Sequence, residues 1–136
     1  MSGIIGQISF DKQTDKHFIK KGLRLIGHRG EDDNGYMMTD YVGIGHNLLS
    51  ITGDKTRQPV SNKERTIFAA VNGEFYDYQD IIKEFNMNVQ TNSDSEMIIQ
   101  LYQRGLLFKY LENGKLNGEF SFFLYDSIKN KVYLGR

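Results

Sequence analysis

The order of the apolar segments along the chain constrains its fold most strongly. Short strand-like segments come in pairs, and segments with a helical period stand between the pairs instead of alternating regularly with single strands. Regular alternation would predict parallel βαβ units, whereas grouped strands and helices predict antiparallel sheets covered by helices. The sequence therefore predicts an α+β layered domain.

Three segments have the apolar spacing of a helix. Residues 15–26, 78–85 and 94–104 repeat apolar side chains every three or four positions, and Gly27 ends the first of these runs. Ser93 followed by Glu96 predicts a capping box at the start of the third helix.

The strand-like segments are shorter. We expect a strand over 3–10, a hairpin over 36–46, a buried strand over 66–71 and a closing hairpin over 120–134. Residues 28–35 are polar and predict turns. The last strand ends close to the final residue, which predicts either a fragment or a sheet edge that a partner covers.

The amino-acid composition limits the kinds of molecule that the chain is expected to bind. The chain has 136 residues, enough for a single domain over 1–136, with 17 basic and 17 acidic residues. This balance gives no attraction to nucleic acid or to an anionic membrane surface. The N-terminus lacks the pattern of a signal peptide, and no apolar stretch reaches the ~20 residues that span a bilayer. We therefore expect a soluble, cytoplasmic protein.

The residue types that usually bind metals do not form a metal-binding pattern. Without cysteine there is no disulfide, thiolate site or thiol nucleophile, and the three histidines lack the spacing of metal ligands. The acidic run 31–35 resembles a calcium loop only superficially, because Gly30 and Tyr41 fall where such a loop needs acidic ligands. We expect no metal and no cofactor.

Two local motifs could carry chemistry. Asn72 and Gly73 follow a predicted strand, and an Asn-Gly pair taken alone favours a hairpin turn. The functional alternative is an oxyanion hole, in which an Asn amide and a backbone N–H donate to a developing oxyanion. Asp94 begins a predicted helix, where a carboxylate is favourable to the helix dipole without any further role.

Seven motifs follow one another from the N-terminus almost to the end of the chain. They are MSGIIG at 1–6, HRGEDDNGY at 28–36, GHNLLSI at 45–51, RQPV at 57–60, VNGEFYD at 71–77, SDSE at 93–96 and LNGEFSFFLYD at 116–126. In this order they resemble the class II glutamine amidotransferase domain of glutamine-dependent asparagine synthetases. The resemblance implies an N-terminal nucleophile hydrolase fold, a four-layer α/β/β/α sandwich with two antiparallel sheets. The family's domain continues beyond the position of Arg136, so the resemblance also implies that the last strands are missing.

The resemblance implies roles for the catalytic positions. In the family the initiator Met is removed, and the cysteine at position 2 attacks the side-chain amide of glutamine with its own α-amine as the base. Ser2 takes the nucleophile position here, and Asn72 with the N–H of Gly73 takes that of the oxyanion hole. Arg29 and Gly30 belong to the family's HRG turn, which we interpret as structural or interdomain. In the family, released ammonia passes to a synthetase domain.

Further matched positions would bind the substrate. The resemblance places Glu74 and Asp94 at the polar groups of glutamine, with Asp94 at its α-ammonium. It places Leu49, Ile51 and Thr52 along the pocket wall. Glutamine or a related small molecule is therefore the expected ligand.

Two positions depart from the family pattern. Ser2 replaces the cysteine, and a hydroxyl is a much weaker nucleophile than a thiol near neutral pH. Leu48 replaces the arginine that pairs with the α-carboxylate of glutamine, and hydrogen bonds to charged groups contribute about 1.5–3 kcal/mol each. Arg57 or Arg24 could compensate. An engineered nucleophile change would leave the arginine in place, so the double loss favours natural loss of glutaminase function.

Three functions remain open. The leading hypothesis is an amidotransferase-like domain with weak or no glutaminase activity and a structural or docking role beside an amide-forming synthetase. The second is a working or engineered glutaminase in which Ser2 acts as the nucleophile. The third is a free-standing binding protein, in which Leu48 favours a ligand less anionic than glutamine. We expect a synthetase domain or protein as partner, and the C-terminal strand edge could also support a homo-oligomer.

Overall fold

The computed structural model describes residues 2–50, 56–91 and 93–136. In chain order the elements are β1 (Gly3–Ile8), α1 (Lys16–Leu25), the 3-10 turn η1 (Gly27–Arg29), β2 (Asp33–Met38), β3 (Val42–Leu48), β4 (Val60–Ser61), β5 (Ile67–Phe75), α2 (Tyr78–Glu84), α3 (Asp94–Gln103), α4 (Leu107–Glu112), β6 (Gly118–Asp126) and β7 (Lys131–Gly135). The predicted helices and strands all form, although β1 ends before Phe10. The apolar spacing does not predict β4 and α4.

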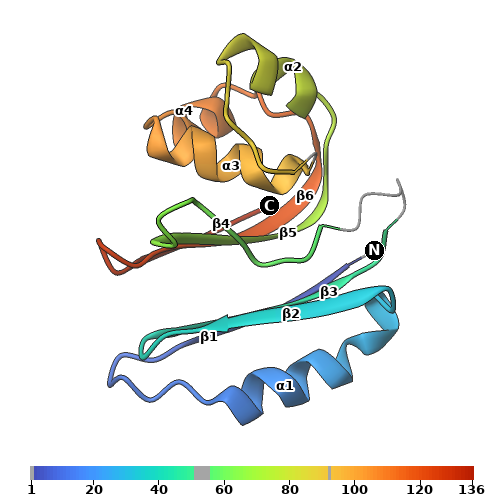
Figure 1. The fold of residues 1–136 in the computed structure, drawn as a ribbon, viewed down its shortest axis with the longest axis vertical. Coiled ribbons are helices and arrows are strands. Elements are labelled where there is room, and N and C mark those ends of the chain that lie inside the picture. The colour runs from blue at the N-terminus through green and yellow to red at the C-terminus, as the bar shows by residue number, and fades with distance from the viewer. Residues whose placement is uncertain (1, 51–55, 92) are drawn as a thin grey trace.

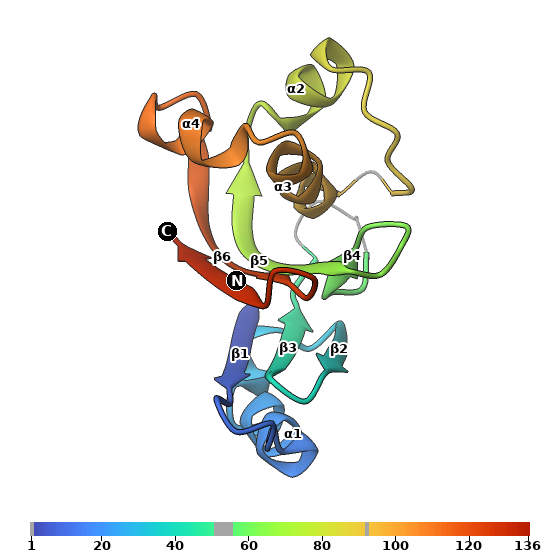
Figure 2. The same ribbon diagram turned by 90° about the vertical axis from the view of Figure 1, so that its left-hand side faces the viewer.

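Two antiparallel sheets lie face to face between two layers of helices (Figure 1). The first sheet has the strand order β1-β3-β2, and the second has the order β4-β5-β6-β7. Helix α1 covers the outer face of the first sheet, and α2, α3 and α4 cover the outer face of the second, as the perpendicular view in Figure 2 also shows. These layers confirm the predicted α/β/β/α sandwich.

Strand β5 contributes to both hydrophobic cores. Ala69 and Val71 pack toward the helices on the outer face of the second sheet. Phe68 and Ala70 face the first sheet, where they pack in one cluster with Ile44 of β3. Side chains of a strand point alternately to its two faces, so the continuous apolar run at the start of β5 fits a strand that is buried on both sides.

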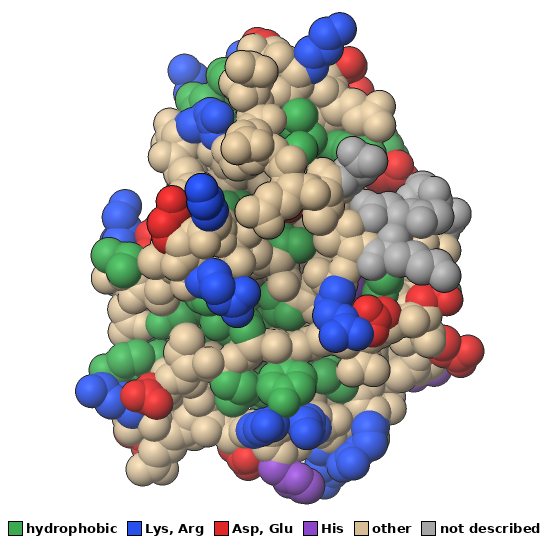
Figure 3. Space-filling model, in the orientation of Figure 1, with side chains coloured by type: hydrophobic (Ala, Val, Ile, Leu, Met, Phe, Trp, Pro, Cys, Tyr) green, Lys and Arg blue, Asp and Glu red, His purple; other side chains and the backbone are tan. Residues whose placement is uncertain are grey.

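Helix α1 has one buried stripe and one basic side. Ile19 and Leu23 lie four residues apart and are buried against the first sheet. Lys16 and Lys20 extend over the ring of Tyr36 on β2, at 5.5 and 5.7 Å from its centroid. Figure 3 shows basic side chains gathered at this lower end of the molecule. The outer side of α1 is therefore a solvated, basic surface.

The Asn-Gly pair does not form the turn that its local sequence favours. Asn72 and Gly73 continue β5, where they pair with Ser121 and Phe120 of β6. Gly73 has φ of +116°, and a Cβ there would lie 1.8 Å from the carbonyl oxygen of Glu119, so the position requires glycine. The hairpin interpretation is therefore wrong, because pairing with the long strand β6 overrides the local turn preference.

Two further local predictions need correction. Residues 28–35 are not all turn, since β2 already begins at Asp33. The capping box is only half formed: the Ser93 hydroxyl accepts a hydrogen bond from the Ser95 N–H at 3.2 Å. The Glu96 carboxylate instead accepts from the Thr91 N–H at 2.8 Å, and the Thr91 hydroxyl accepts from the Ser93 N–H at 3.2 Å. Glu96 therefore fixes the segment before α3 rather than the cap itself.

Candidate functional site

A cavity of about 560 Å³ opens beside the start of β1 and the ends of β3 and β5. The described residues that line it are Ser2, Leu48, Leu49, Ser50, Thr56, Gln58, Val71, Asn72, Gly73, Glu74, Tyr76, Tyr78, Ser93, Asp94, Glu119, Phe120, Ser121 and Arg136. Seven of the nine predicted site residues are in this lining. The other two, Ile51 and Thr52, lie outside the described residues. Residues that are far apart in the sequence thus meet at one cavity.

Ser2 is held at the cavity by both of its polar oxygens. Its hydroxyl oxygen accepts a hydrogen bond from the Leu49 N–H at 3.2 Å, and its carbonyl accepts from Nε of Arg29 at 3.1 Å. Only 8% of Ser2 is exposed. Gly30 allows this arrangement, since a Cβ there would lie 2.7 Å from the backbone of Asn47. The HRG turn therefore supports the start of β1, which fits the structural role expected for it.

Asn72 and Gly73 approach the cavity from the second sheet. The side-chain oxygen of Asn72 is buried and has no hydrogen-bond partner among the described residues. The amide group and the adjacent backbone N–H are donors of the kind that an oxyanion hole needs. A buried polar atom without a partner costs free energy, so the burial of the Asn72 oxygen is an unfavourable feature of this part of the fold.

The residue before Asn72 is fixed by two buried side chains. His46 of β3 forms a hydrogen bond of 3.0 Å between its Nε2 and the carbonyl oxygen of Val71, and Gln58 accepts from the Val71 N–H at 2.7 Å. His46 pairs with Ile4 of β1 in the first sheet, so its ring ties the sheet that carries Ser2 to the strand that carries Asn72. Sequence spacing alone does not identify this tie, because His46 and Val71 are 25 residues apart.

The electrostatic environment of His46 favours its neutral form. The ring is completely buried, and burial lowers the pKa of His46 from 6.5 to about 4, although the hydrogen bond to Val71 raises it. A neutral ring that donates from Nε2 carries a lone pair on Nδ1, and this Nδ1 has no partner among the described residues. At neutral pH His46 is therefore an uncharged ring that links the two sheets through its hydrogen bond, and it does not act as an acid.

The side of the cavity expected to bind substrate combines apolar and acidic groups. Leu48 is 7% exposed, whereas its neighbour Leu49 is 38% exposed. Asp94 is half-buried at the start of α3, and its carboxylate accepts a hydrogen bond from the Phe75 N–H at 2.9 Å. Glu74, on β5, is exposed. Leu48 therefore presents an apolar side chain to the cavity, at the position where the resemblance predicts an arginine.

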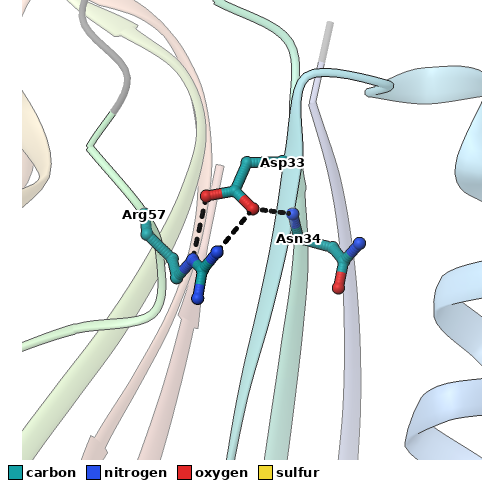
Figure 4. A network of polar contacts seen from close by, with 3 residues as sticks. All are labelled: Asp33, Asn34 and Arg57. Atoms are coloured by element: carbon teal, nitrogen blue, oxygen red, sulfur yellow. Dashed lines mark hydrogen bonds and ion pairs between the residues drawn. The ribbon is translucent and has the colours of Figure 1, made fainter.

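Arg57 and Arg24 are not among the described residues that line the cavity. Neither residue therefore takes the place of the arginine that the resemblance predicts at position 48. Arg57 donates from Nε and a terminal nitrogen to the Asp33 carboxylate at 2.8 and 2.9 Å, as Figure 4 shows. The hydrogen bond from Arg57 holds the pKa of Asp33 below its ordinary value. Arg136 is the one Lys or Arg side chain in the described lining. The expectation that Arg57 compensates is thus not supported by its contacts.

The cavity does not gather a set of metal ligands. Within residues 2–50, 56–91 and 93–136, no group of three or more His, Cys, Asp or Glu side chains could hold a metal ion. No helix in the described parts of the chain is both long and apolar enough to cross a membrane.

Comparison with known proteins identifies the family. A family model described as a glutamine amidotransferase domain matches residues 1–136. A putative asparagine synthetase [glutamine-hydrolyzing] of Methanocaldococcus jannaschii is 30% identical, with 100% of this chain and 28% of the relative covered. Asparagine synthetase B [glutamine-hydrolyzing] of Escherichia coli is 39% identical, with 93% of this chain and 24% of the relative covered. The chain thus spans between a fifth and a third of these relatives, and it belongs to the glutamine amidotransferase domain family.

Proposed function

We propose that this chain is an amidotransferase domain that hydrolyses glutamine weakly or not at all. In this proposal it has a structural or docking role beside an ATP-dependent, amide-forming synthetase. The names of its relatives support the association with asparagine synthesis. Glutamine, or a molecule related to it, is the class of ligand proposed for the cavity and the natural probe of its activity.

The observation that carries the proposal is the buried Leu48 in the cavity lining. An α-carboxylate beside this side chain loses a charge-assisted hydrogen-bond partner, and such bonds contribute about 1.5–3 kcal/mol each. The Arg57 guanidinium is already paired with Asp33. Glutamine binding should therefore be weakened by a factor of about 10 to 100 relative to a site with a dedicated cation.

Ser2 gives a second reason to expect that glutamine is hydrolysed slowly. Its hydroxyl is a neutral, weakly acidic group, whereas a thiol has a pKa of about 8.5 and is partly ionised at neutral pH. If Met1 is removed, the α-amine of Ser2 could act as the base. A hydroxyl activated only by that amine should react much more slowly than a thiol at the same position.

A second candidate function is a working or engineered glutaminase in which Ser2 is the nucleophile. The shared lining of Ser2, Asn72 and Gly73 favours it, because the nucleophile and both oxyanion donors belong to one cavity. The two candidates differ in one measurable quantity, the release of ammonia that depends on Ser2.

Ammonia release from glutamine tests the proposal. The assay uses the chain after removal of Met1, with the Ser2→Ala variant as the matched control. We expect ammonia formation by the chain to equal that of Ser2→Ala and of buffer. Ammonia release that Ser2→Ala abolishes would establish the second candidate instead.

An exposed apolar groove supports the docking role. Strand β7 forms one edge of the second sheet, and an apolar groove of about 560 Å³ lies beside it. Its lining includes Ile4, Ile8 and Leu134, and Ile8 and Leu134 are 45% and 68% exposed. We infer that a synthetase partner covers this groove, since exposed apolar grooves favour association.

Size-exclusion chromatography of the chain mixed with an amide-forming synthetase from the same organism tests the docking surface. Leu134→Glu should abolish co-elution. Ile128→Glu, at a position that is 78% exposed and outside the described lining of the groove, should leave it intact. Co-elution that both variants retain would exclude this groove, and self-association without the synthetase would identify a homo-oligomer instead.

A further inference from the structure

The outer face of α1 carries charge of one sign only. The helix lies on the first sheet and turns its other side to solvent (Figure 1). Its exposed residues are Lys16, His17, Phe18, Lys20, Lys21, Arg24 and Leu25. Each of them is Lys, Arg, His or apolar, and α1 contains no acidic residue. Exposed helix faces usually combine both signs of charge, because opposite charges three or four residues apart stabilise a helix. This face is therefore unusual.

The charge pattern of α1 does not stabilise the chain on its own. Lys20 lies four residues from both Lys16 and Arg24, and like charges at this spacing destabilise a helix. Lys16 also lies in the first turn, which has no acidic residue and where the helix dipole disfavours a cation. Within the described parts of the chain the ion pair found joins Arg57 to Asp33, so the basic residues of α1 have no ion-pair partner there. Carboxylates of another molecule would relieve this repulsion.

Charged and apolar side chains form separate rows on this face. Residues four apart lie on the same side of a helix, so Lys16, Lys20 and Arg24 form one row. This row borders β2, because Lys16 and Lys20 lie over an aromatic ring of that strand. Phe18 and Leu25 are seven residues apart and form a second row, and they are 45% and 69% exposed. The two rows fit a segment with carboxylates on one side and apolar side chains on the other.

The basic surface is short and is bordered by acidic residues. A helix of ten residues at about 1.5 Å per residue is about 15 Å long. Exposed carboxylates precede the helix and follow η1, at Asp11, Asp15, Glu31 and Asp32. The helix holds four of the 17 basic residues and none of the 17 acidic ones, so the rest of the chain has 13 and 17, a net charge of −4. A membrane or a nucleic acid would extend beyond α1 and meet these carboxylates, whereas a short acidic segment would not.

We propose that the outer face of α1 binds a short, acidic, amphipathic helix of a partner protein. Carboxylates of that helix pair with the row of Lys16, Lys20 and Arg24, and its apolar side chains cover Phe18 and Leu25. No residue of α1 belongs to the described lining of the candidate cavity or of the apolar groove. The proposal therefore goes beyond the proposed function and does not depend on glutamine hydrolysis.

Fluorescence anisotropy of labelled peptides mixed with the whole chain tests the chemistry of the partner. The probe is a peptide of about 15 residues, long enough to form a helix, with Glu along one side and Leu along the other. A second peptide has Gln in place of Glu, and a third has Ala in place of Leu. We expect the Glu–Leu peptide to bind at least about tenfold more tightly than either, and its affinity should fall as the salt concentration rises.

Two results of the peptide experiment would overturn the proposal. The first is equal affinity of the three peptides, which would mean that neither row of α1 selects its partner. The second is no binding of the Glu–Leu peptide. Binding of the chain to phosphatidylserine vesicles or to duplex DNA in its place would identify an extended anionic partner instead.

The double variant Lys20→Glu with Lys21→Glu tests the location of the surface. It should weaken binding of the Glu–Leu peptide at least about tenfold. Lys83→Glu with Lys109→Glu makes the same charge change at exposed positions on α2 and α4, and should change the affinity by under about twofold because salt screens distant charges. Lys20→Glu places opposite charges four residues apart, so the thermal midpoint should not fall, which separates lost binding from lost folding. Equal affinity of the two double variants would overturn the proposal.

Leu25→Ser tests the apolar row. It should weaken binding of the Glu–Leu peptide at least about threefold and leave the Glu–Ala peptide unaffected, because only the Leu side chains are buried against this row. Ile128→Ser, at a position that is 78% exposed in the turn between β6 and β7, is the matched control and should bind as the unmodified chain does. Equal effects of Leu25→Ser on both peptides would contradict the assignment. Ammonia release from glutamine is a separate readout, so failure of this proposal leaves the proposed function standing.

Discussion

Acidification should destabilise the protein through His46. The ring is completely buried, and its pKa is about 4 in the folded chain compared with 6.5 for an ordinary histidine. Between these values the unfolded chain binds a proton that the folded chain excludes, so stability falls as pH falls. The two pKa values differ by about 2.5, and one pKa unit corresponds to about 1.36 kcal/mol. The loss should therefore be about 2 kcal/mol at pH 5 and approach roughly 3 kcal/mol near pH 4.

Urea unfolding at pH 7.5 and pH 5, followed by circular dichroism, measures this effect. His46→Gln keeps an amide donor for the Val71 carbonyl but cannot titrate, so it should lose about 2 kcal/mol less than the unmodified chain between the two pH values. The substitution can lower stability at both pH values without affecting this comparison. His17→Gln, at an exposed position on α1, is the matched control and should retain the full pH dependence.

The same loss of stability between pH 7.5 and pH 5 in the unmodified chain and in His46→Gln would refute the reasoning. It would mean that burial does not keep the His46 ring neutral in the folded state. Asp33 and Asp126 do not confuse the comparison, because their pKa values are lowered from 3.8 and both carboxylates are present in every variant.

Three further experiments test other parts of the structure. Gly73→Ala should cost at least about 1–3 kcal/mol in thermal unfolding, because φ is +116° and the new Cβ would meet the β6 backbone. Leu124→Ala should cost about 2–5 kcal/mol in urea unfolding because the side chain is fully buried, whereas Leu134→Ala, 68% exposed, should change stability by under about 0.5 kcal/mol. A double-mutant cycle that replaces Arg57 and Asp33 by Ala should give a coupling free energy of unfolding below about 1 kcal/mol, since the Arg57 side chain is 69% exposed. This coupling free energy should decrease as the salt concentration rises. An unchanged thermal midpoint in Gly73→Ala would contradict the need for glycine at this position. Equal losses of stability in the two leucine variants would contradict the assigned burial of Leu124, and a large coupling free energy that salt does not change would contradict the exposed position of Arg57.

The layered fold could be predicted from the sequence because it depends on long, strongly patterned segments. The run at 67–71 is apolar throughout, which fits the buried start of β5, and α1 shows the spacing of Ile19 and Leu23 clearly. Strand β4 has two residues and α4 has six, so neither is long enough to show a period. Such short elements form only because the surrounding structure supports them.

Parts of the candidate site could not be predicted from the local sequence. Asn72 and Gly73 predict a turn when taken alone, and only their pairing with β6 keeps them in a strand. The motif order predicts seven of the described residues that line the cavity, yet it gives no role to His46 or Gln58. Both act through the backbone of Val71, and a backbone hydrogen bond from a distant side chain leaves no pattern in the sequence.

The central claim is that two side chains, Ser2 and Leu48, silence an otherwise intact glutamine site. Ammonia release from glutamine by the double variant Ser2→Cys with Leu48→Arg tests it most directly, with each single variant and the unmodified chain measured in parallel after removal of Met1. We predict that ammonia release by the double variant exceeds that of either single variant. No release by a double variant that folds and keeps its unfolding midpoint would contradict the claim, because the defect would then lie elsewhere in the cavity.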